Sequence, residues 1–456
     1  MHREPEDNSA LQPYRADGLD SKFDPAIATA DATSGNYRWA IVGMLWFICF
    51  FNYADRQAIS AVLPLLESEF HFSKSQLGLI SGAFMVVYGL SAPLAGMVGD
   101  RASRKLVILS GLYVWSAITG FTAVCSRLWQ FVLVRGAEGL GETFYFPASM
   151  SLVSDYHGQQ TRSRAMALHQ TSVYAGIIGG GVLTGWLADK FGWQFPFICF
   201  GVAGILLGLF LARFLREPAR NAAERATAPQ AAETVKPVNW FRFALDYLTN
   251  PASLCLLLAF VGANTVAGVL YTWLITFYKE KFGLSLTTAS IVGTVFIQVA
   301  AMIGSASGGF AADYWRRSWL GGRVGVQAVG IICGIPMILL CTLTTNLNLA
   351  IAAMIALGIC KGVYDSNIWP AIYEVVPPSR RSSAVGMANM VGWVGAFIGT
   401  LGLGALVDAG ITMSHAIAYT AIIYAVVGIL LAASALIFTP AHIRAEQAAA
   451  EPPALG

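Results

Sequence analysis

Long runs of apolar residues, separated by short polar segments, follow one another along most of the 456-residue chain. A helix that crosses a hydrocarbon core of about 30 Å needs about 20 residues, each contributing about 1.5 Å. Runs of that length predict helices at residues 39–62, 76–98, 105–125, 128–150, 165–187, 194–215, 252–277, 288–312, 323–344, 347–372, 382–406 and 413–438. We therefore expect an all-α polytopic membrane protein with twelve transmembrane helices.

The composition agrees with this pattern and narrows the class of protein. Hydrophobic residues make up 56% of the chain and charged residues 12%, with a mean hydropathy of +0.59, whereas soluble domains carry about 25% charged residues. The formal net charge is only +3, and the basic residues fall in short loops, so we expect no nucleic-acid partner. The seven cysteines lie in apolar runs without CxxC spacing, and the chain has no P-loop and no Ser/His/Asp arrangement. We expect no enzyme, no cofactor and no metal.

Polar segments divide the chain into parts. Residues 1–38 lack the apolar core of a signal peptide and predict a disordered tail. Residues 216–250 are rich in Ala, Pro and charge and predict a linker between two six-helix bundles, 39–215 and 251–439, with a tail at 440–456.

The short loops also predict the orientation. The more basic loops contain Arg101, Arg104, Lys105, Arg162, Arg164, Arg316, Arg317, Arg323, Arg380 and Arg381, and the others only Lys74, Arg127, Lys190, Lys279 and Lys281. By the positive-inside rule, the first set, both termini and the linker are cytoplasmic. We expect a monomer in the lipid bilayer of a bacterial-type inner membrane.

The two bundles carry related motifs and are expected to be pseudo-symmetric. GMVGDRASRK (Gly96 to Lys105) ends the second predicted span, and GFAADYWRR (Gly309 to Arg317) ends the eighth. The first motif resembles the loop signature of the major facilitator superfamily, with Ser103 in place of the usual Gly, and RGAEGLGE (Arg135 to Glu142) resembles its fourth-helix signature. The resemblance implies a secondary active transporter in which two bundles open a central site alternately to either side.

Two branches of that superfamily fit the motifs. NYADR (Asn52 to Arg56) and ETFYFP (Glu142 to Pro147) resemble the anion:cation symporters, although Thr143 and Phe144 depart from the pattern. This resemblance implies proton-coupled symport of a small organic anion, a sugar acid or another carboxylate. FNYADR, GLGE and VVPPSRRSSA (Val375 to Ala384) also resemble the Spinster-like group, which implies proton-linked transport of lysolipids or organic solutes. A membrane sensor that binds without transporting is the alternative from another class.

The first and fourth predicted helices carry charges within the membrane. Arg135, Glu138 and Glu142 are spaced i, i+3, i+7 and share one face, and Asn52, Asp55 and Arg56 are spaced i, i+3, i+4. A charge at the bilayer centre costs at least about 2.5 to 3.5 kcal/mol, so it is kept when paired or functional.

These charges predict a proton-coupling group of Asp55, Glu142, Arg135 and Glu138. If the two stripes face each other, Asp55 can neutralise Arg135 or Arg56, and Glu142 is the surplus carboxylate that carries a proton. The alternative is a set of structural ion pairs between the two helices. The resemblance to the anion:cation symporters further implies that Arg56, with Asn52 beside it, grips the substrate carboxylate.

Further candidates for substrate binding lie in the second bundle. Lys361 and Asp365 are spaced i, i+4 and can neutralise each other within one helix, or open to a substrate. Tyr271, Asn389 and Trp393 could line the cavity, or serve only in packing between helices. His169 suits proton traffic, but a lone histidine in a membrane helix more often makes a buried interhelical hydrogen bond.

Charged residues at the cytoplasmic helix ends predict a gate. Asp100, Arg101 and Arg104 follow the second span, and Asp313 and Arg316 follow the eighth. A carboxylate there can cap a neighbouring helix while the basic residues meet acidic groups, which would latch one conformation closed. Resemblance to the superfamily implies that Asp100 stabilises the outward-facing state, and the topogenic role of the basic residues is the alternative.

Overall fold

The computed structural model describes residues 35–99, 102–218, 240–377 and 380–450, and this part of the chain is helical without strands. A first group contains α2 (Tyr37–Phe70), α3 (Lys74–Gly99), α4 (Arg104–Thr122), α5 (Leu128–Thr143), α6 (Tyr145–Tyr156), α7 (Gln159–Phe191) and α8 (Gln194–Phe214). A second group contains α10 (Trp240–Thr249), α11 (Pro251–Phe282), α12 (Leu286–Ser318), α13 (Gly322–Leu343), α14 (Leu347–Asp365), α15 (Ile368–Val375), α16 (Arg381–Asp408), α17 (Met413–Ala418), α18 (Thr420–Ala433), the π-helix η2 (Ser434–Phe438) and α19 (Thr439–Ala450).

Ten helical stretches in the described residues are long and apolar enough to cross a membrane. The expected spans 39–62 and 128–150 are not among them, but helices form at both places. The first is the 34-residue helix α2, which carries Asp55 and Arg56 in its middle. The second is divided between α5 and α6, which have 16 and 12 residues.

Prolines explain two of the breaks that the hydropathy pattern alone did not predict. Pro147 lacks a backbone donor, and its ring clashes with the carbonyl of residue 143, which is the last residue of α5. Pro370 stands in the same relation to Ser366, directly after the end of α14 at Asp365. The expected spans 128–150 and 347–372 are therefore bent helix pairs.

Each group is packed around close helix contacts. In the first group α2 packs on α7, α3 on α5 and α4 on α8, and in the second α14 packs on α12 and α13, and α11 on α16 and α18. The backbones of α2 and α7 approach so closely that a Cβ on Gly180 would lie 2.4 Å from the Cα of Ala54. Small residues at such crossings let helices pack tightly where lipid offers no hydrophobic driving force.

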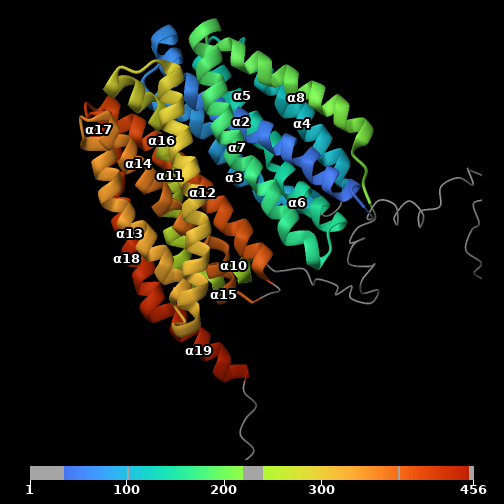
Figure 1. Ribbon diagram of the computed structural model, residues 1–456, viewed down its shortest axis with the longest axis vertical. Coiled ribbons are helices and arrows are strands. Elements are labelled where there is room, and N and C mark those ends of the chain that lie inside the picture. The colour runs from blue at the N-terminus through green and yellow to red at the C-terminus, as the bar shows by residue number, and fades with distance from the viewer. Residues whose placement is uncertain (1–34, 100–101, 219–239, 378–379, 451–456) are drawn as a thin grey trace, which may run out of the picture.

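The most extensive contacts between the two groups join α3 with α16, α7 with α12 and α2 with α11. We call the side on which α4 begins and α12 ends the basic side, because Arg104, Lys105, Arg316 and Arg323 lie there. The opposite side carries the start of α3 and the end of α16. Figure 1 shows the first group in blue to green and the second in yellow to red. The two groups diverge toward the basic side, where α6 and α15 lie.

Candidate functional site

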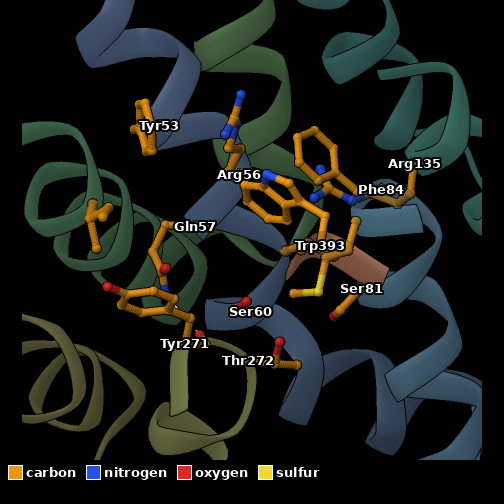
Figure 2. A pocket seen from close by; sticks show the side chains of 13 residues that line it. Tyr53, Arg56, Gln57, Ser60, Ser81, Phe84, Arg135, Tyr271, Thr272 and Trp393 are labelled. Carbon is orange, nitrogen blue, oxygen red and sulfur yellow. Dashed lines mark hydrogen bonds between the residues drawn. The ribbon is translucent and has the colours of Figure 1, made fainter. Parts of the chain in front are cut away.

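A pocket lies between the two groups at the middle of the helices and is lined by both of them (Figure 2). It encloses about 550 Å³, open space at its mouth included. The first group contributes Tyr53, Arg56, Phe84 and Arg135, and the second contributes Tyr271, Thr272 and Trp393. The walls are mostly apolar and aromatic, with few polar groups, which is typical of a small-molecule site.

Arg56 is the central polar group of this pocket. Its Nε donates to Glu142 Oε2 at 2.6 Å, which joins α2 to α5. The guanidinium carbon lies 4.6, 4.9, 4.5 and 5.8 Å from the ring centres of Tyr53, Phe84, Tyr88 and Trp393. These aromatic faces stabilise a cation that has lost most of its water.

The Arg56 pair is nevertheless incomplete. Arg56 Nη1 and Glu142 Oε1 are buried without a hydrogen-bond partner among the described residues. A buried donor or acceptor without a partner carries its full desolvation cost. The pair therefore leaves one donor and one acceptor unsatisfied beside the pocket.

Arg135 and Glu138 form a second ion pair on α5, three residues apart. Glu138 Oε1 also accepts from Thr119 Oγ1 of α4 at 3.0 Å. The ring of Phe84 lies 5.0 Å from the Arg135 guanidinium and 4.9 Å from that of Arg56, so it separates the two cations. Figure 2 shows both arginines on the same side of the pocket.

The pairing corrects one expectation from the sequence. Asp55 neutralises neither arginine through an ion pair, because Glu142 occupies Arg56 and Glu138 occupies Arg135. Both Asp55 carboxylate oxygens, and Nδ2 of Asn52 one turn away, are buried without a hydrogen-bond partner in the described residues. The surplus carboxylate is therefore Asp55 and not Glu142.

Lys361 and Asp365 pair with each other on α14, as their spacing allows. The Lys361 ammonium lies 5.5 Å from the ring centre of Tyr271, whose ring also lines the pocket. Tyr271 further accepts, through its backbone oxygen, a hydrogen bond of 3.3 Å from Gln57 Nε2, which crosses between the groups. The Lys361 pair thus lies next to the pocket, on the far side of Tyr271.

Of the other candidate residues, some line the pocket and some do not. Trp393 lines the pocket, 5.0 Å from the Tyr88 ring centre, while Asn389 on the same helix is not among its lining residues. His169 is fully buried, with its Nε2 3.1 Å from the Tyr145 hydroxyl, which itself donates to Leu45 O. This is the interhelical hydrogen bond that was one of the two explanations for His169.

Sequence reasoning missed several lining residues. Gln57 and Ser60 on α2 and Ser81, Phe84 and Met85 on α3 line the pocket but carry no charge that would single them out in an apolar run. On α2 the spacing from Arg56 would have found Ser60, since residue i+4 lies near the same face, whereas Gln57, at i+1, does not.

On the basic side, each group has its own ionic cluster. In the first, Arg104 pairs with Asp155 of α6, and Glu217 accepts from the backbone nitrogens of Arg104 at 2.7 Å and Lys105 at 3.3 Å. Glu217 also contacts the Ser103 hydroxyl. The carboxylate that caps α4 is therefore Glu217, while the expected latch residues Asp100 and Arg101 lie outside the described residues.

The second cluster has the same design in the other group. Glu374 of α15 accepts from Arg316 at 2.8 Å and from Arg323 at 3.0 Å, and Arg323 also pairs with Asp313 at 2.6 Å. These contacts tie α12, α13 and α15 together and do not link the second group to the first.

Contacts that link the groups are concentrated on the opposite side. Asp408 at the end of α16 accepts from the backbone nitrogens of Lys74 and Ser75 at 2.9 and 2.8 Å. Asp189 at the end of α7 accepts from Thr287 at the start of α12, at 3.2 Å from N and 2.8 Å from Oγ1. Lys74 also pairs with Glu280 at 2.5 Å. We call these contacts the seal.

The seal is reciprocal, because each group supplies one carboxylate and one helix N-terminus. A carboxylate at a helix N-terminus is stabilised by the unpaired backbone N–H groups and the helix dipole. The packing beneath is tight, since a Cβ on Gly404 would lie 2.3 Å from the backbone oxygen of Lys74. The groups are therefore held together on the opposite side.

Comparison with known proteins supports this architecture. A model of the Major Facilitator Superfamily matches residues 45–399. The hexuronate transporter of Bacillus subtilis (strain 168) is 24% identical over 374 residues, which cover 80% of this chain and 87% of that protein. Protein spinster homolog 1 of Xenopus tropicalis is 27% identical over 376 residues, which cover 77% of this chain and 69% of that protein.

A solved structure shares the fold. It is that of a bacterial homolog of the human lysosomal transporter Spinster, in an inward-facing and unoccupied conformation. The TM-score is 0.74 at 21% identity, and the match covers 92% of this chain and 100% of that one.

Proposed function

Because the chain belongs to the Major Facilitator Superfamily, we propose that this integral membrane transporter carries a small organic anion together with protons by alternating access. The observation on which the proposal rests is Arg56. It is a guanidinium in an aromatic pocket between two helix groups, held by one carboxylate and with Nη1 left without a partner. Such a group binds a substrate carboxylate through two parallel hydrogen bonds.

Competition for Arg56 supplies the coupling to protons. A substrate carboxylate that binds Arg56 displaces Glu142, which is fully buried. An ionised carboxylate left there without its partner costs several kcal/mol, and a proton on Glu142 removes that cost. The anion therefore enters the site together with a proton, which is symport.

Asp55 supplies a second place for a proton. It lies in the same cluster as Glu138, Glu142 and Arg135 but has no ion-pair partner among the described residues. Arg135 and Glu138 complete the proton-coupling group, and Asn52, Trp393 and Tyr271 supply hydrogen-bond donors or aromatic surface to the substrate.

The proposed architecture has twelve spans in two bundles, 39–215 and 251–439. The bent pairs α5–α6 and α14–α15 each count as one span, as do α17, α18 and η2 together. The basic side is cytoplasmic by the positive-inside rule, and the protein works as a monomer in an inner membrane. With the seal closed on the opposite side, the described conformation is inward-facing.

The ionic clusters on the basic side form the proposed gate. Arg104 with Asp155 and Arg316 with Glu374 hold the inner ends of each bundle in shape, and Asp313 joins the second cluster. Asp100 and Arg101 belong to the same gate by their place in the motif.

A second candidate is Spinster-like transport of a lysolipid or another amphipathic solute. The aromatic and aliphatic lining, which includes Phe84, Ile177 and Trp393, favours it because an acyl chain could pack there. The two candidates differ in what must bind Arg56, a carboxylate or a phosphate headgroup.

The deciding experiment uses the purified protein in liposomes with an imposed pH gradient. Uptake of a sugar-acid panel, including a hexuronate, is measured beside a lysophospholipid panel. Accumulation of a sugar acid that collapses with a protonophore supports the first proposal, and movement of lysolipid alone supports the second. Binding without accumulation of either would identify a sensor.

A further inference from the structure

A second ion pair lies behind one lining residue of the pocket, Tyr271. Lys361 and Asp365 are on α14, in the second group, and the Lys361 ammonium is 5.5 Å from the ring centre of Tyr271. That ring lines the pocket together with Arg56 (Figure 2). One tyrosine therefore contacts a cation of the second group and lines the pocket that holds a cation of the first.

The ion pair itself explains little of its place in the membrane. It joins two residues of one helix, four positions apart, and the contact of α14 with another helix here is the one between Lys361 and the Tyr271 ring. An i, i+4 pair adds little to the stability of a helix, whereas each charge is expensive at this depth. A leucine and a methionine would pack there at lower cost.

The Lys361 pair repeats the design of the Arg56 pair. In both, a cation is neutralised by a carboxylate of this chain and lies over aromatic surface, four rings at Arg56 and the Tyr271 ring at Lys361. Asp365 is the more exposed partner, with 28% of its side chain accessible against 12% for Lys361. Asp365 can therefore turn away to solvent and leave Lys361 to another carboxylate.

We propose that Lys361 and Tyr271 form a second anion subsite, and that the transporter selects organic dianions with a carboxylate at each end. One carboxylate binds Arg56 and the other binds Lys361, so that a single ligand bridges the two helix groups. This rests on the proposed function, because it presumes that Arg56 binds the first carboxylate. Tyr271 would donate a hydrogen bond to the second carboxylate of the ligand.

The test compares two six-carbon sugar acids that differ at one end only. Galactarate has two carboxylates, and galactonate has one carboxylate and one hydroxymethyl group. Their half-inhibition concentrations are measured against uptake of a labelled sugar acid in liposomes. We expect the wild-type protein to prefer galactarate by about tenfold, the value of one charge-assisted contact.

The variant Lys361→Gln/Asp365→Asn removes both charges and leaves neither partner alone. We expect its preference for galactarate to fall to about one, since the second carboxylate no longer finds a cation. Tyr271→Phe, which keeps the ring, should lower the preference by a smaller factor. The matched control is Arg380→Gln/Asp246→Asn, an ion pair of 2.7 Å on the basic side, and its preference should equal that of the wild type.

Each outcome is decisive. An unchanged preference in the Lys361→Gln/Asp365→Asn variant, or a wild type without preference, overturns the second subsite while transport of sugar acids stands. Failure of the wild type to bind either sugar acid overturns the proposed function and the subsite with it. If the double variant does not fold, Tyr271→Phe decides the question. A reduced preference for galactarate supports the subsite, and an unchanged preference overturns it.

Discussion

At the scale of single residues, the neutralisation of Arg56 by Glu142 is the contact from which most consequences follow. The pair joins two helices at the pocket, with an N–O distance of 2.6 Å. Breaking a buried pair by removing one charge costs about 3 to 5 kcal/mol, because the other charge stays buried alone. Glu142 and Asp55 can therefore be told apart by stability, although both are proposed to carry protons.

We predict that Glu142→Gln and Asp55→Asn both abolish accumulation driven by a pH gradient, since an amide cannot carry a proton. Only Glu142→Gln should also lower the melting temperature, because it leaves Arg56 unpaired, whereas Asp55 has no ion-pair partner to lose. Uptake and thermal unfolding of the purified variants check this. Glu446→Gln, on an exposed part of α19, is the control. Accumulation at the wild-type level in both variants would refute their role in coupling.

Arg56 itself allows a second prediction. Arg56→Lys keeps the charge but loses the planar fork and the stacking on four aromatic rings. We expect the half-saturation concentration of the anion to rise about tenfold or more, the equivalent of one lost hydrogen bond to a charged group, while the protein still folds. The measurement is substrate-dependent uptake. An unchanged half-saturation concentration would mean that Arg56 serves only as the structural partner of Glu142.

Only some residues of this site could be predicted from the sequence. Helical spacing placed Asn52, Asp55 and Arg56 on one face, but it did not determine whether that face meets the face of Glu142. Which carboxylate pairs with which arginine depends on differences of about one side-chain length, which spacing does not resolve. The sequence analysis did not identify Phe84 and Tyr88. An aromatic residue that lines a site cannot be told from one that only packs between helices until its neighbours are known.

At the scale of helices, the sequence predicted where helices lie better than where they end or bend. The run 165–187 became α7, Gln159–Phe191, because helices continue past the hydrocarbon core into polar residues. The bends at residues 144 and 366 follow from Pro147 and Pro370, whose effect on the preceding turn was not weighed against hydropathy. In each case the bend lies three or four residues before a proline within the expected span, and that proline is the signal that would have found it.

Capping on the basic side gives a prediction for α4. Glu217 accepts two backbone hydrogen bonds from the first turn of this helix, 2.7 and 3.3 Å long. Glu217→Ala should destabilise the protein by about 1 kcal/mol, the usual cost of a lost cap. Glu217→Gln keeps an acceptor and should cost less. Thermal or denaturant unfolding in detergent checks the order, and equal stability of all three proteins would contradict the capping role.

At the scale of the whole molecule, the seal joins the two groups on the opposite side. Its carboxylates, Asp189 and Asp408, each cap a helix of the other group. Such contacts contribute about 0.3 to 2 kcal/mol each, and the conformers of a transporter differ by a few kcal/mol. Losing both contacts is therefore enough to redistribute the conformers.

We predict that Asp189→Asn/Asp408→Asn shifts the molecule toward the outward-open conformation. On a background without the seven native cysteines, a cysteine at Ser60, which lines the pocket, should react faster with a membrane-impermeant thiol reagent added outside. Its labelling from the inside should slow. The single variants should each give an intermediate rate, and equal rates in the double variant and its parent would remove the seal from the mechanism.

The salt bridge within the seal has one more consequence. Lys74 pairs with Glu280, whose side chain is 41% exposed at the opposite side, so dissolved ions reach this contact. Screening extends over about 10 Å at 0.1 M ionic strength and over about 3 Å at 1 M. In the proposed orientation, a rise in the salt concentration of the outer medium would weaken this contact and leave the buried Arg56 pair unaffected. Saltier surroundings would thereby raise the fraction of empty transporters that are open to the outside.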